Sequence, residues 1–229
     1  HQVGDDHGEA QAWNNLGLAL RQVRRFEEAI NAYRHDLAYC QQVGDTHREG
    51  QAWNNLGLAL RQVRRFEEAI EALTRARDLH HQVGGDHGEA SAWNNLGLAL
   101  AEVRRFEEAI EAHTRAQQAF QQVGDAHSEA SAWNNLGLAL YESGQPEEAL
   151  EAFSHDLDYC RQAGDSHGEA VTLRNVAETL ASLGRVGEAV SALVRAMELF
   201  EAVGDEHKAA GTREFLDQLR QDPDPEQEN

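Results

Sequence analysis

The chain has 229 residues, of which 41% are hydrophobic, and its 40 acidic residues outnumber its 20 basic ones to give a formal net charge of −20. Nucleic acids and anionic membranes are bound by positively charged surfaces, so this balance argues against both as general partners. The sequence shows no signal peptide and no apolar run long enough to span a membrane, and we expect a cytoplasmic protein.

A nine-residue stretch, A-W-N-N-L-G-L-A-L, organises the sequence. It occurs at 12–20, 52–60, 92–100 and 132–140, and an altered copy, T-L-R-N-V-A-E-T-L, lies at 172–180. The spacing is 40 residues each time, and a fixed period of this size predicts stacked supersecondary units. We predict a remnant of a preceding repeat at 1–4 and five repeats, at 5–44, 45–84, 85–124, 125–164 and 165–204.

The first half of each repeat predicts a helix, which in the first repeat runs from Glu9 to Val23. Its apolar stripe has the i, i+3, i+4, i+7 spacing of one helical face and consists of Trp13, Leu16, Gly17 and Leu20. A capping box, in which Ser, Thr or Asp precedes Glu by three residues, marks the expected helix start. The boxes are Asp6/Glu9, Thr46/Glu49, Asp86/Glu89 and Ser166/Glu169; Ala126 interrupts the pattern in repeat four, where Asp125 or Ser128 is the expected substitute.

The second half of each repeat predicts another helix, from Phe26 to Val43 in the first. A glycine follows each second helix and supplies the left-handed residue that favours a helix C-terminus, at Gly44, Gly84, Gly124, Gly164 and Gly204. The turn between the two helices contains arginine in the first three repeats and glycine in the last two, so we expect its conformation to differ between them. The residues concerned are Arg24, Arg64, Arg104, Gly144 and Gly184.

The C-terminal part departs from the repeat pattern. A sixth first helix at 205–221 carries charged residues and is expected to cap the array. The tail at 222–229, D-P-D-P-E-Q-E-N, is acidic and broken by proline, which predicts disorder. Cys40 and Cys160 share one position three repeats apart, too far for a disulfide, and we interpret both as packing residues.

These features resemble the tetratricopeptide repeat. The family's Trp-Leu-Gly pattern on the first helix corresponds to Trp13, Leu16 and Gly17, whereas Asp36 and Asp156 depart from it by replacing a later alanine. The longer period is similar to that of LGN-type scaffolds and kinesin light chains, and most of all to that of the C-terminal sensor arrays of actinobacterial signal-transduction ATPases. The resemblance implies an all-α, right-handed superhelical solenoid that binds a protein or peptide and is not an enzyme.

One face of the first helix is not needed for this packing. On a helical wheel, Asn14, Asn15, Leu18 and Arg21 lie nearly opposite Trp13. The resemblance implies that this face lines a concave groove in which asparagines hold the main chain of a peptide. The candidate peptide-binding residues are Asn14, Asn15, Leu18, Arg21, Asn54, Asn55, Leu58, Arg61, Asn94, Asn95, Leu98, Asn134, Asn135, Leu138, Arg174 and Asn175.

Both the leucine and the asparagine of this face have alternative explanations. The recurring leucine could pack on adjacent first helices. The asparagine ladder (Asn15, Asn55, Asn95, Asn135 and Asn175) persists where Trp and Gly are lost, and asparagine is an indifferent helix former whose amide both donates and accepts hydrogen bonds. The ladder either binds peptide backbone, forms hydrogen-bonded spacers between repeats, or is inherited from recent duplication.

Charge varies along the predicted groove. Arg21 and Arg61 make its early part positive, whereas residues 121–160 contain eight acidic residues and no Lys or Arg. We therefore expect a partner with an acidic portion near repeats one and two.

Six histidines recur at one position, namely His7, His47, His87, His127, His167 and His207. Zinc holds its ligands about 2 Å away, whereas packed helices lie roughly 8–10 Å apart, so we predict junction packing and no metal site. No motif for nucleotide binding, metal hydrolysis or a nucleophilic triad occurs, and we expect no cofactor. Two rival functions stay open: a ligand-sensing regulatory domain of a larger signalling ATPase, and a structural array with weak self-association.

Overall fold

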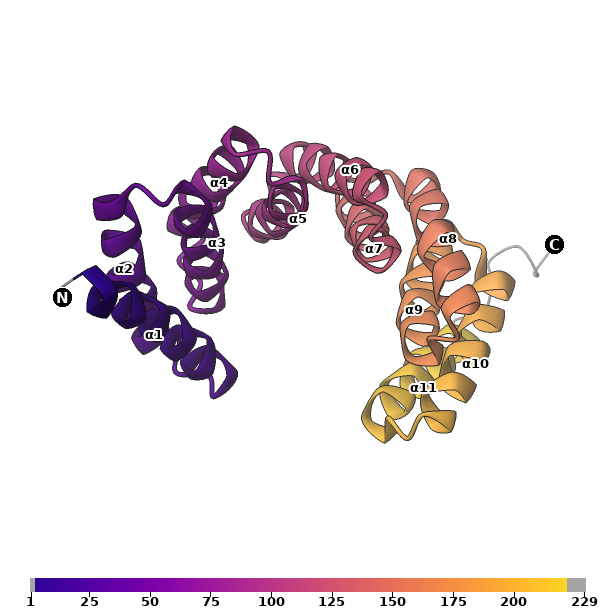
Figure 1. Ribbon diagram of the computed structural model, residues 1–229. Coiled ribbons are helices and arrows are strands. Elements are labelled where there is room, and N and C mark those ends of the chain that lie inside the picture. Colours follow the sequence, from indigo (N-terminus) through magenta and orange to yellow (C-terminus); the bar gives the residue numbers. More distant parts are fainter. Residues whose placement is uncertain (1–2, 222–229) are drawn as a thin grey trace. The chain divides into compact units, whose positions relative to one another are not determined.

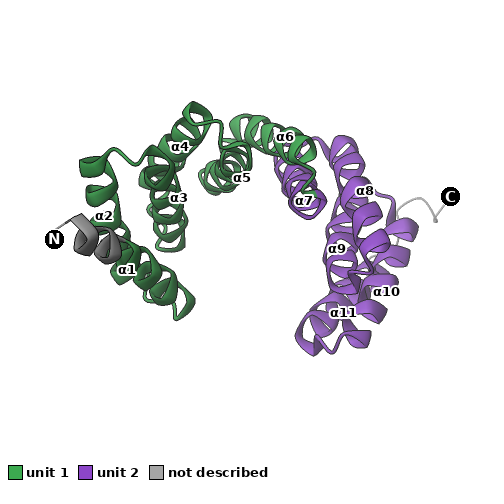
Figure 2. Ribbon diagram, viewed as in Figure 1, with its two compact units in different colours: residues 1–125 green, residues 126–229 purple. Residues whose placement is uncertain are grey.

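The computed structural model describes residues 3–221, and their side chains from residue 11 onward (Figure 1). Within residues 3–221 the chain forms eleven α-helices and no strand, as the sequence predicts. It divides into two compact units, unit 1 at 1–125 and unit 2 at 126–229, which Figure 2 colours separately. The tail at 222–229, for which disorder was expected, lies outside the described residues, as do the side chains of Asp6, His7 and Glu9.

Unit 1 is built from three helix pairs (Figure 1). Its helices are α1 (Val3–Gln22), α2 (Phe26–Val43), α3 (Thr46–Gln62), α4 (Phe66–Gln82), α5 (Asp86–Glu102) and α6 (Phe106–Val123). The helices of each pair pack on each other, and α2 and α4 also pack on the first helix of the next pair. Because α3 contacts both α1 and α5, the first helices form one layer of the unit.

Unit 2 contains two helix pairs and a final single helix. Its helices are α7 (Ala126–Glu142), α8 (Pro146–Ala163), α9 (Ser166–Ser182), α10 (Val186–Ala202) and α11 (Glu206–Gln221). The first helices α7 and α9 contact each other, and α11 packs on α10 at the place where the sequence predicts a capping helix. The second helix of the first repeat also has the predicted bounds, from Phe26 to Val43.

A close contact between a glycine and a large side chain joins the two helices of each of the first four repeats. A Cβ atom on Gly57 would lie 2.5 Å from Leu73 Cγ, and one on Gly17 would lie 2.5 Å from Tyr33 Cε1. Only glycine lets the second helix approach this closely. Repeat three places His113 against Gly97 in the same way.

The tryptophans of the first helices are half-buried and contact different partners. Trp13 stacks on His35 with ring centroids 4.4 Å apart, and Trp133 stacks on His155 at 4.2 Å. Trp93 lies under the guanidinium of Arg77, 4.6 Å from the ring centroid. These three tryptophans therefore pack their rings against a polar or charged side chain of a second helix rather than in a wholly apolar core.

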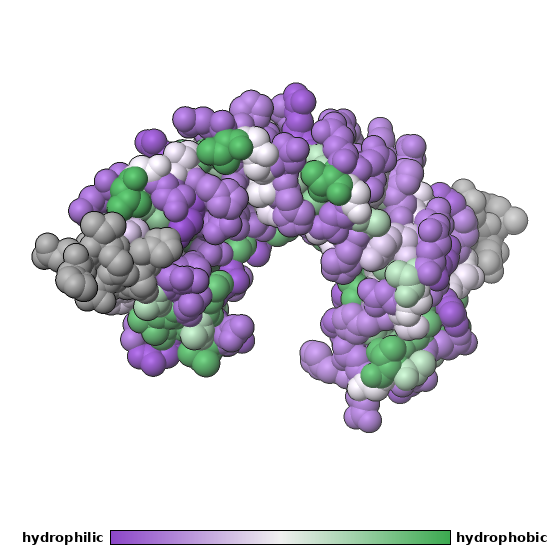
Figure 3. All heavy atoms as spheres, viewed as in Figure 1, coloured by the Kyte–Doolittle hydropathy of each residue, from purple (hydrophilic) through white to green (hydrophobic). Residues whose placement is uncertain are grey.

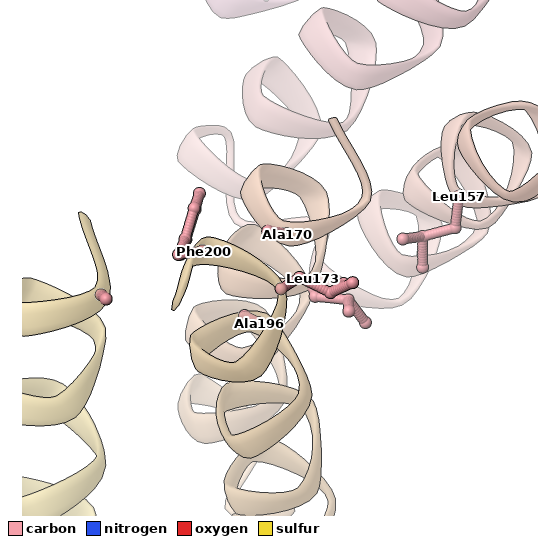
Figure 4. Close-up of a cluster of buried hydrophobic side chains, with 7 residues drawn as sticks. Leu157, Ala170, Leu173, Ala196 and Phe200 are labelled. Carbon is pink, nitrogen blue, oxygen red and sulfur yellow. The ribbon is translucent and has the colours of Figure 1, made fainter. Parts of the chain in front are cut away.

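The altered fifth repeat keeps an apolar core although leucine replaces its tryptophan. Figure 4 shows Leu157, Ala170, Leu173, Ala196 and Phe200 gathered between helices of unit 2, and all are buried. These residues come from α8, α9 and α10, so the core of this unit runs through successive helices. A continuous core shared between neighbouring helices is the expected arrangement in a repeat array.

The surface visible in Figure 3 is mainly hydrophilic, with separate hydrophobic patches. One expected core residue is exposed: Leu16 keeps 44% of its surface, whereas its counterparts Leu56 and Leu96 are buried. Those two leucines lie on helices that a preceding second helix covers, and no helix among the described residues covers this side of α1. Val23, at the end of α1, is 64% exposed.

The helix starts differ from the predicted capping boxes. The cap lies one residue earlier, because Asp45 accepts a hydrogen bond from the Arg48 amide at 3.1 Å and Asp165 accepts one from the Gly168 amide at 2.8 Å. Glu49 accepts instead from the indole of Trp53, at 3.2 Å. The carboxylate beside a helix N-terminus is thus supplied by the aspartate that follows the terminal glycine.

The start of α1 and the turn between the helices also differ from what the sequence predicts. α1 begins at Val3 rather than at Glu9. The turn between the helices is the same in all repeats, because the arginines adopt the left-handed conformation with φ of 60–62° at Arg24, Arg64 and Arg104. The expectation that the turn differs between the first three repeats and the last two was therefore wrong. The three arginines have a strained, left-handed backbone conformation.

Candidate functional site

The first-helix face of unit 1 contains a cavity of about 620 Å³. Four candidate groove residues line it, namely Asn14, Leu18, Asn54 and Asn55. Gln51 and Ser91 add further polar side chains to its wall. The wall also includes the imidazoles of His47, His80 and His87 and the carboxylate of Asp86. The cavity therefore combines amides, imidazoles, one carboxylate and one hydroxyl with one leucine.

The asparagines of this face are hydrogen-bonded to one another between repeats. Asn55 Nδ2 donates to Asn14 Oδ1 at 3.2 Å, and Asn95 Nδ2 donates to Asn54 Oδ1 at 3.0 Å. In unit 2, Asn175 Nδ2 is 3.4 Å from Asn134 Oδ1. These are the inter-repeat bonds that the sequence left open as an alternative, and each primary amide has further hydrogen-bonding capacity beyond one such bond.

The other candidate residues differ in how deeply their side chains are buried. Leu18, Leu58 and Leu98 are half-buried, whereas Leu138 is 39% exposed. Arg21 and Arg61 are half-buried, and Asn15 and Arg174 are exposed. Asn94 Oδ1 lies 3.0 Å from His113 Nδ1, so this asparagine holds a core side chain.

Unit 2 has two cavities on its first helices. One, of about 280 Å³, is lined by Asn134, Asn135, Asp156 and Thr172 together with the exposed His127 and His167. The other, of about 450 Å³, lies between α9 and α11 and includes Arg174, Asn175 and Lys208. The candidate residues that line these cavities all belong to first helices, and each cavity lies within a single unit.

Comparison with known proteins identifies the family. The family model described as "Tetratricopeptide repeat" matches residues 8–82, 48–122, 88–162 and 128–202, which together cover most of the chain. The chain belongs to the tetratricopeptide repeat family. The predicted fold class, an all-α solenoid of helix-turn-helix repeats, is confirmed, and this fold is typically a non-catalytic scaffold for protein interactions. A search of curated proteins found no match.

Solved structures of other tetratricopeptide repeat arrays share the fold. A putative kinesin light chain from Podosopora anserina has a TM-score of 0.72 at 15% identity, over 84% of this chain and 95% of the other. The signal transduction ATPase PH0952 from Pyrococcus horikoshii, which has a tetratricopeptide repeat sensor, has a TM-score of 0.80 at 15% identity, over 90% and 32%. A Rap protein complexed with Competence and Sporulation Factor has a TM-score of 0.74 at 16% identity, over 90% and 57%.

Four of the six recurring histidines of this tetratricopeptide repeat array contact a ring on the second helix of the same repeat, as the predicted junction packing requires, namely His47, His87, His127 and His167. His87 meets the edge of Phe120 with centroids 5.7 Å apart, and its Nε2 lies 3.0 Å from Asp125 Oδ2. His167 meets Phe200 at 5.9 Å. In the part of the chain that the structure describes, no three His, Cys, Asp or Glu side chains are grouped as metal ligands, and no helix has the length and apolarity to cross a membrane.

Two buried carboxylates depart from the family pattern, and their chemistry was missed in the sequence. Asp36 forms a salt bridge with Arg48 at 2.9 Å; burial raises the pKa of the Asp36 carboxyl, and Arg48 opposes that rise. Asp156 is equally buried and forms no salt bridge with any described residue. The signal in the sequence was the exchange of alanine for aspartate, but Arg48, the charge partner of Asp36, lies in the next repeat.

Both cysteines are free and buried, in agreement with their interpretation as packing residues. Burial and the nearby carboxylate raise the pKa of the Cys40 thiol to about 12, and burial with Asp156 raises that of Cys160 equally. A thiol with such a pKa forms almost no thiolate near neutral pH and is unreactive.

Proposed function

We propose that this array binds an extended segment of a partner protein along the first-helix face of unit 1. The observation that carries the proposal is the cavity of about 620 Å³ bounded by hydrogen-bonded asparagine pairs. An extended peptide presents a donor and an acceptor at each residue, which side-chain amides can meet. The tetratricopeptide repeat fold supports a role in protein interaction.

The asparagine pairs favour binding by being ordered before a ligand arrives. Because Asn55 is fixed by Asn14, and Asn95 by Asn54, their amides lose little side-chain freedom when a peptide binds. Leu18, which is half-buried in the same cavity, offers an apolar contact for a peptide side chain. The structure of a Rap protein complexed with Competence and Sporulation Factor gives a precedent for ligand binding on this fold.

Selection from a display library of random linear peptides tests the proposal. The asparagines are unsuitable probes, because their replacement also removes bonds between repeats. Leu18→Asp places a charge in the cavity and should weaken a selected peptide by about tenfold or more. Ala38→Asp is the matched control, since Ala38 is exposed on α2 beside a different cavity. Failure to select any binder, or equal weakening by both variants, contradicts the proposal.

The second candidate is a sensor domain of a larger signalling ATPase. It is supported by the similarity to the protein from Pyrococcus horikoshii that carries a tetratricopeptide repeat sensor. In that case Leu18→Asp would change ATP turnover by the parent protein.

The exposed Leu16 and Val23 of α1 favour weak self-association as a further property, which light scattering at increasing concentration would measure.

A further inference from the structure

The segment H-D-L-x-Y-C occurs once in each unit, at 35–40 and at 155–160. It buries an aspartate at the same position, leaving Asp36 2% and Asp156 6% exposed. The other three repeats have alanine there, at Ala76, Ala116 and Ala196. A buried carboxylate is costly unless it is paired and hydrogen-bonded, so the partners of these two aspartates need to be compared.

In unit 1 the carboxylate is neutralised from within the chain. Arg48, which projects from the start of α3, donates from Nη2 to Asp36 Oδ1 at 2.9 Å. The same oxygen lies 3.7 Å from the thiol of Cys40. The negative charge of Asp36 is therefore neutralised at Oδ1 by the guanidinium of Arg48.

In unit 2 the position of Arg48 is occupied by Gly168. Asp156 Oδ2 accepts from Asn134 Nδ2 at 2.9 Å and from the hydroxyl of Thr172. Among the described residues, Asp156 Oδ1 accepts only the thiol of Cys160, at 3.7 Å. The oxygen that binds a guanidinium in unit 1 thus has only a weak donor in unit 2.

The cavity of about 280 Å³ is lined by Asp156 together with residues of α7, α8 and α9, the helices labelled in Figure 1. Gly168 and Asp165 are part of its wall, and no lysine or arginine is among the described residues that line it. Lys208 lies beside the lining residue His167, with its ammonium 3.0 Å from His167 Nε2 and 3.6 Å from Asp205. The local charge is negative, since residues 121–160 contain eight acidic residues and no Lys or Arg.

We propose that this cavity receives the guanidinium of an arginine side chain from the bound partner, which donates to Asp156 Oδ1 as Arg48 donates to Asp36 Oδ1. Arginine fits better than lysine, because its planar fork satisfies a carboxylate and a neighbouring acceptor together and can stack on an aromatic ring. Tyr159 supplies such a ring in the cavity wall. The inference rests on the proposed function, because it takes the array to bind a protein partner, and it assigns one side chain of such a partner to unit 2.

A titration with capped amino acids tests the cavity by itself. Nitrogen-15-labelled protein would be titrated with N-acetyl-arginine amide and with its citrulline counterpart, which keeps the shape but lacks the charge. We expect saturable shifts of the Asn134 side-chain amide and of Thr172 with arginine, and an affinity for citrulline about tenfold or more lower. Equal responses to the two ligands, or no shifts at these residues, would overturn the inference.

Two variants locate the binding. Gly168→Arg should place an internal guanidinium on Asp156 and exclude the capped arginine. Its Cβ would lie 2.5 Å from Asp165 Oδ2 and 2.8 Å from Cys160 Sγ, so both side chains must shift. The equivalent residues Asp45 and Cys40 accommodate Arg48 in unit 1. Gly187→Arg is the matched control, because nothing lies within 4 Å of its Cβ position. Equal binding by both variants would also contradict the inference.

A third variant removes the carboxylate without creating a sequence foreign to the array. The double change Asp156→Ala and Thr172→Ala restores the alanines that repeat three and its successor have at Ala116 and Ala132, and it should fold and lose the arginine-dependent shifts. If selected peptides bind unit 1 but capped arginine does not bind the protein, this inference alone fails. If capped arginine binds while no peptide is selected, the proposed function fails instead.

Discussion

Asp36 in unit 1 and Asp156 in unit 2 occupy equivalent positions, but Arg48 pairs with the first, and the second is held by Asn134 and Thr172. The turn between helices has a positive φ in both units, but the residue at that position is arginine in unit 1 and glycine in unit 2. Nearly identical repeats therefore carry different local chemistry, and the difference lies in residues that the repeat pattern does not fix.

The largest expected effect is the loss of the cation in unit 1. Arg48→Ala leaves the buried Asp36 carboxylate without its charge partner and should lower the free energy of unfolding by about 3 kcal/mol at neutral pH. Because burial already raises the pKa of Asp36, this cost should shrink as the pH falls and the carboxyl takes up a proton. Urea denaturation at two pH values measures both effects.

The double variant Arg48→Ala and Asp36→Ala provides the control for this prediction. It gives unit 1 the alanine found at Ala76 and Ala116, and stability should largely return. If the double variant is as unstable as Arg48→Ala, the loss comes from the packing of the arginine stem, and the contrast between the units is not one of charge.

His113, a buried polar residue in repeat three, also makes stability depend on pH. Burial lowers the pKa of His113 to about 4, whereas an unfolded histidine titrates near 6.5. The unfolded state binds the proton more readily, so stability is complete above pH ~6.5 and falls by about 3 kcal/mol as the pH approaches 4. His113→Leu, which copies Leu73, should remove this part of the pH dependence in denaturation experiments. An unchanged pH profile would show that His113 is protonated without cost.

In unit 2 the contribution of neutral donors should be smaller. Thr172→Ala removes the hydroxyl that donates to Asp156 and should cost about 1–2 kcal/mol. Hydrogen exchange of α8 and α9 would detect the loss locally. Adding Asp156→Ala should recover it, and a loss that persists in the double variant would assign the effect to the Thr172 bond with the Gly168 carbonyl, 3.2 Å away.

The smallest effect concerns the turns. Arg64→Gly relieves a non-glycine residue at φ 62° and should stabilise unit 1 by about 1 kcal/mol, less any contribution from Arg64 above Phe66 at 5.7 Å. Gly144→Arg should destabilise unit 2 by a similar amount. Thermal unfolding of the two variants measures both. A destabilised Arg64→Gly would mean that the contact with Phe66 outweighs the backbone strain.

The sequence predicted the parts of the fold that depend on period and polarity. The bounds of α2, the terminal glycines and the junction histidines follow from spacing within one repeat. The capping-box motif pointed to Thr46, which precedes Glu49 by three residues, whereas the cap is Asp45, which precedes Arg48 at that spacing.

The candidate site was predictable as a face but not as a set of bonds. Helical spacing places Asn14 and Asn55 on that face, but their hydrogen bond depends on the stagger between α1 and α3, which tertiary packing sets. The pairing of Asp36 with Arg48 crosses from one repeat to the next and leaves no periodic signal. Sequence periodicity identifies positions, and contacts between repeats decide what each position does.

The four tryptophans give each of the first four repeats its own spectroscopic label. Trp13 and Trp133 stack on imidazoles and Trp93 lies beneath a guanidinium, so fluorine-19 resonances from labelled indoles should be resolved from one another. Repeat arrays open in parts rather than all at once. A single labelled sample would therefore report the order in which individual repeats open, and on which of them a bound partner acts.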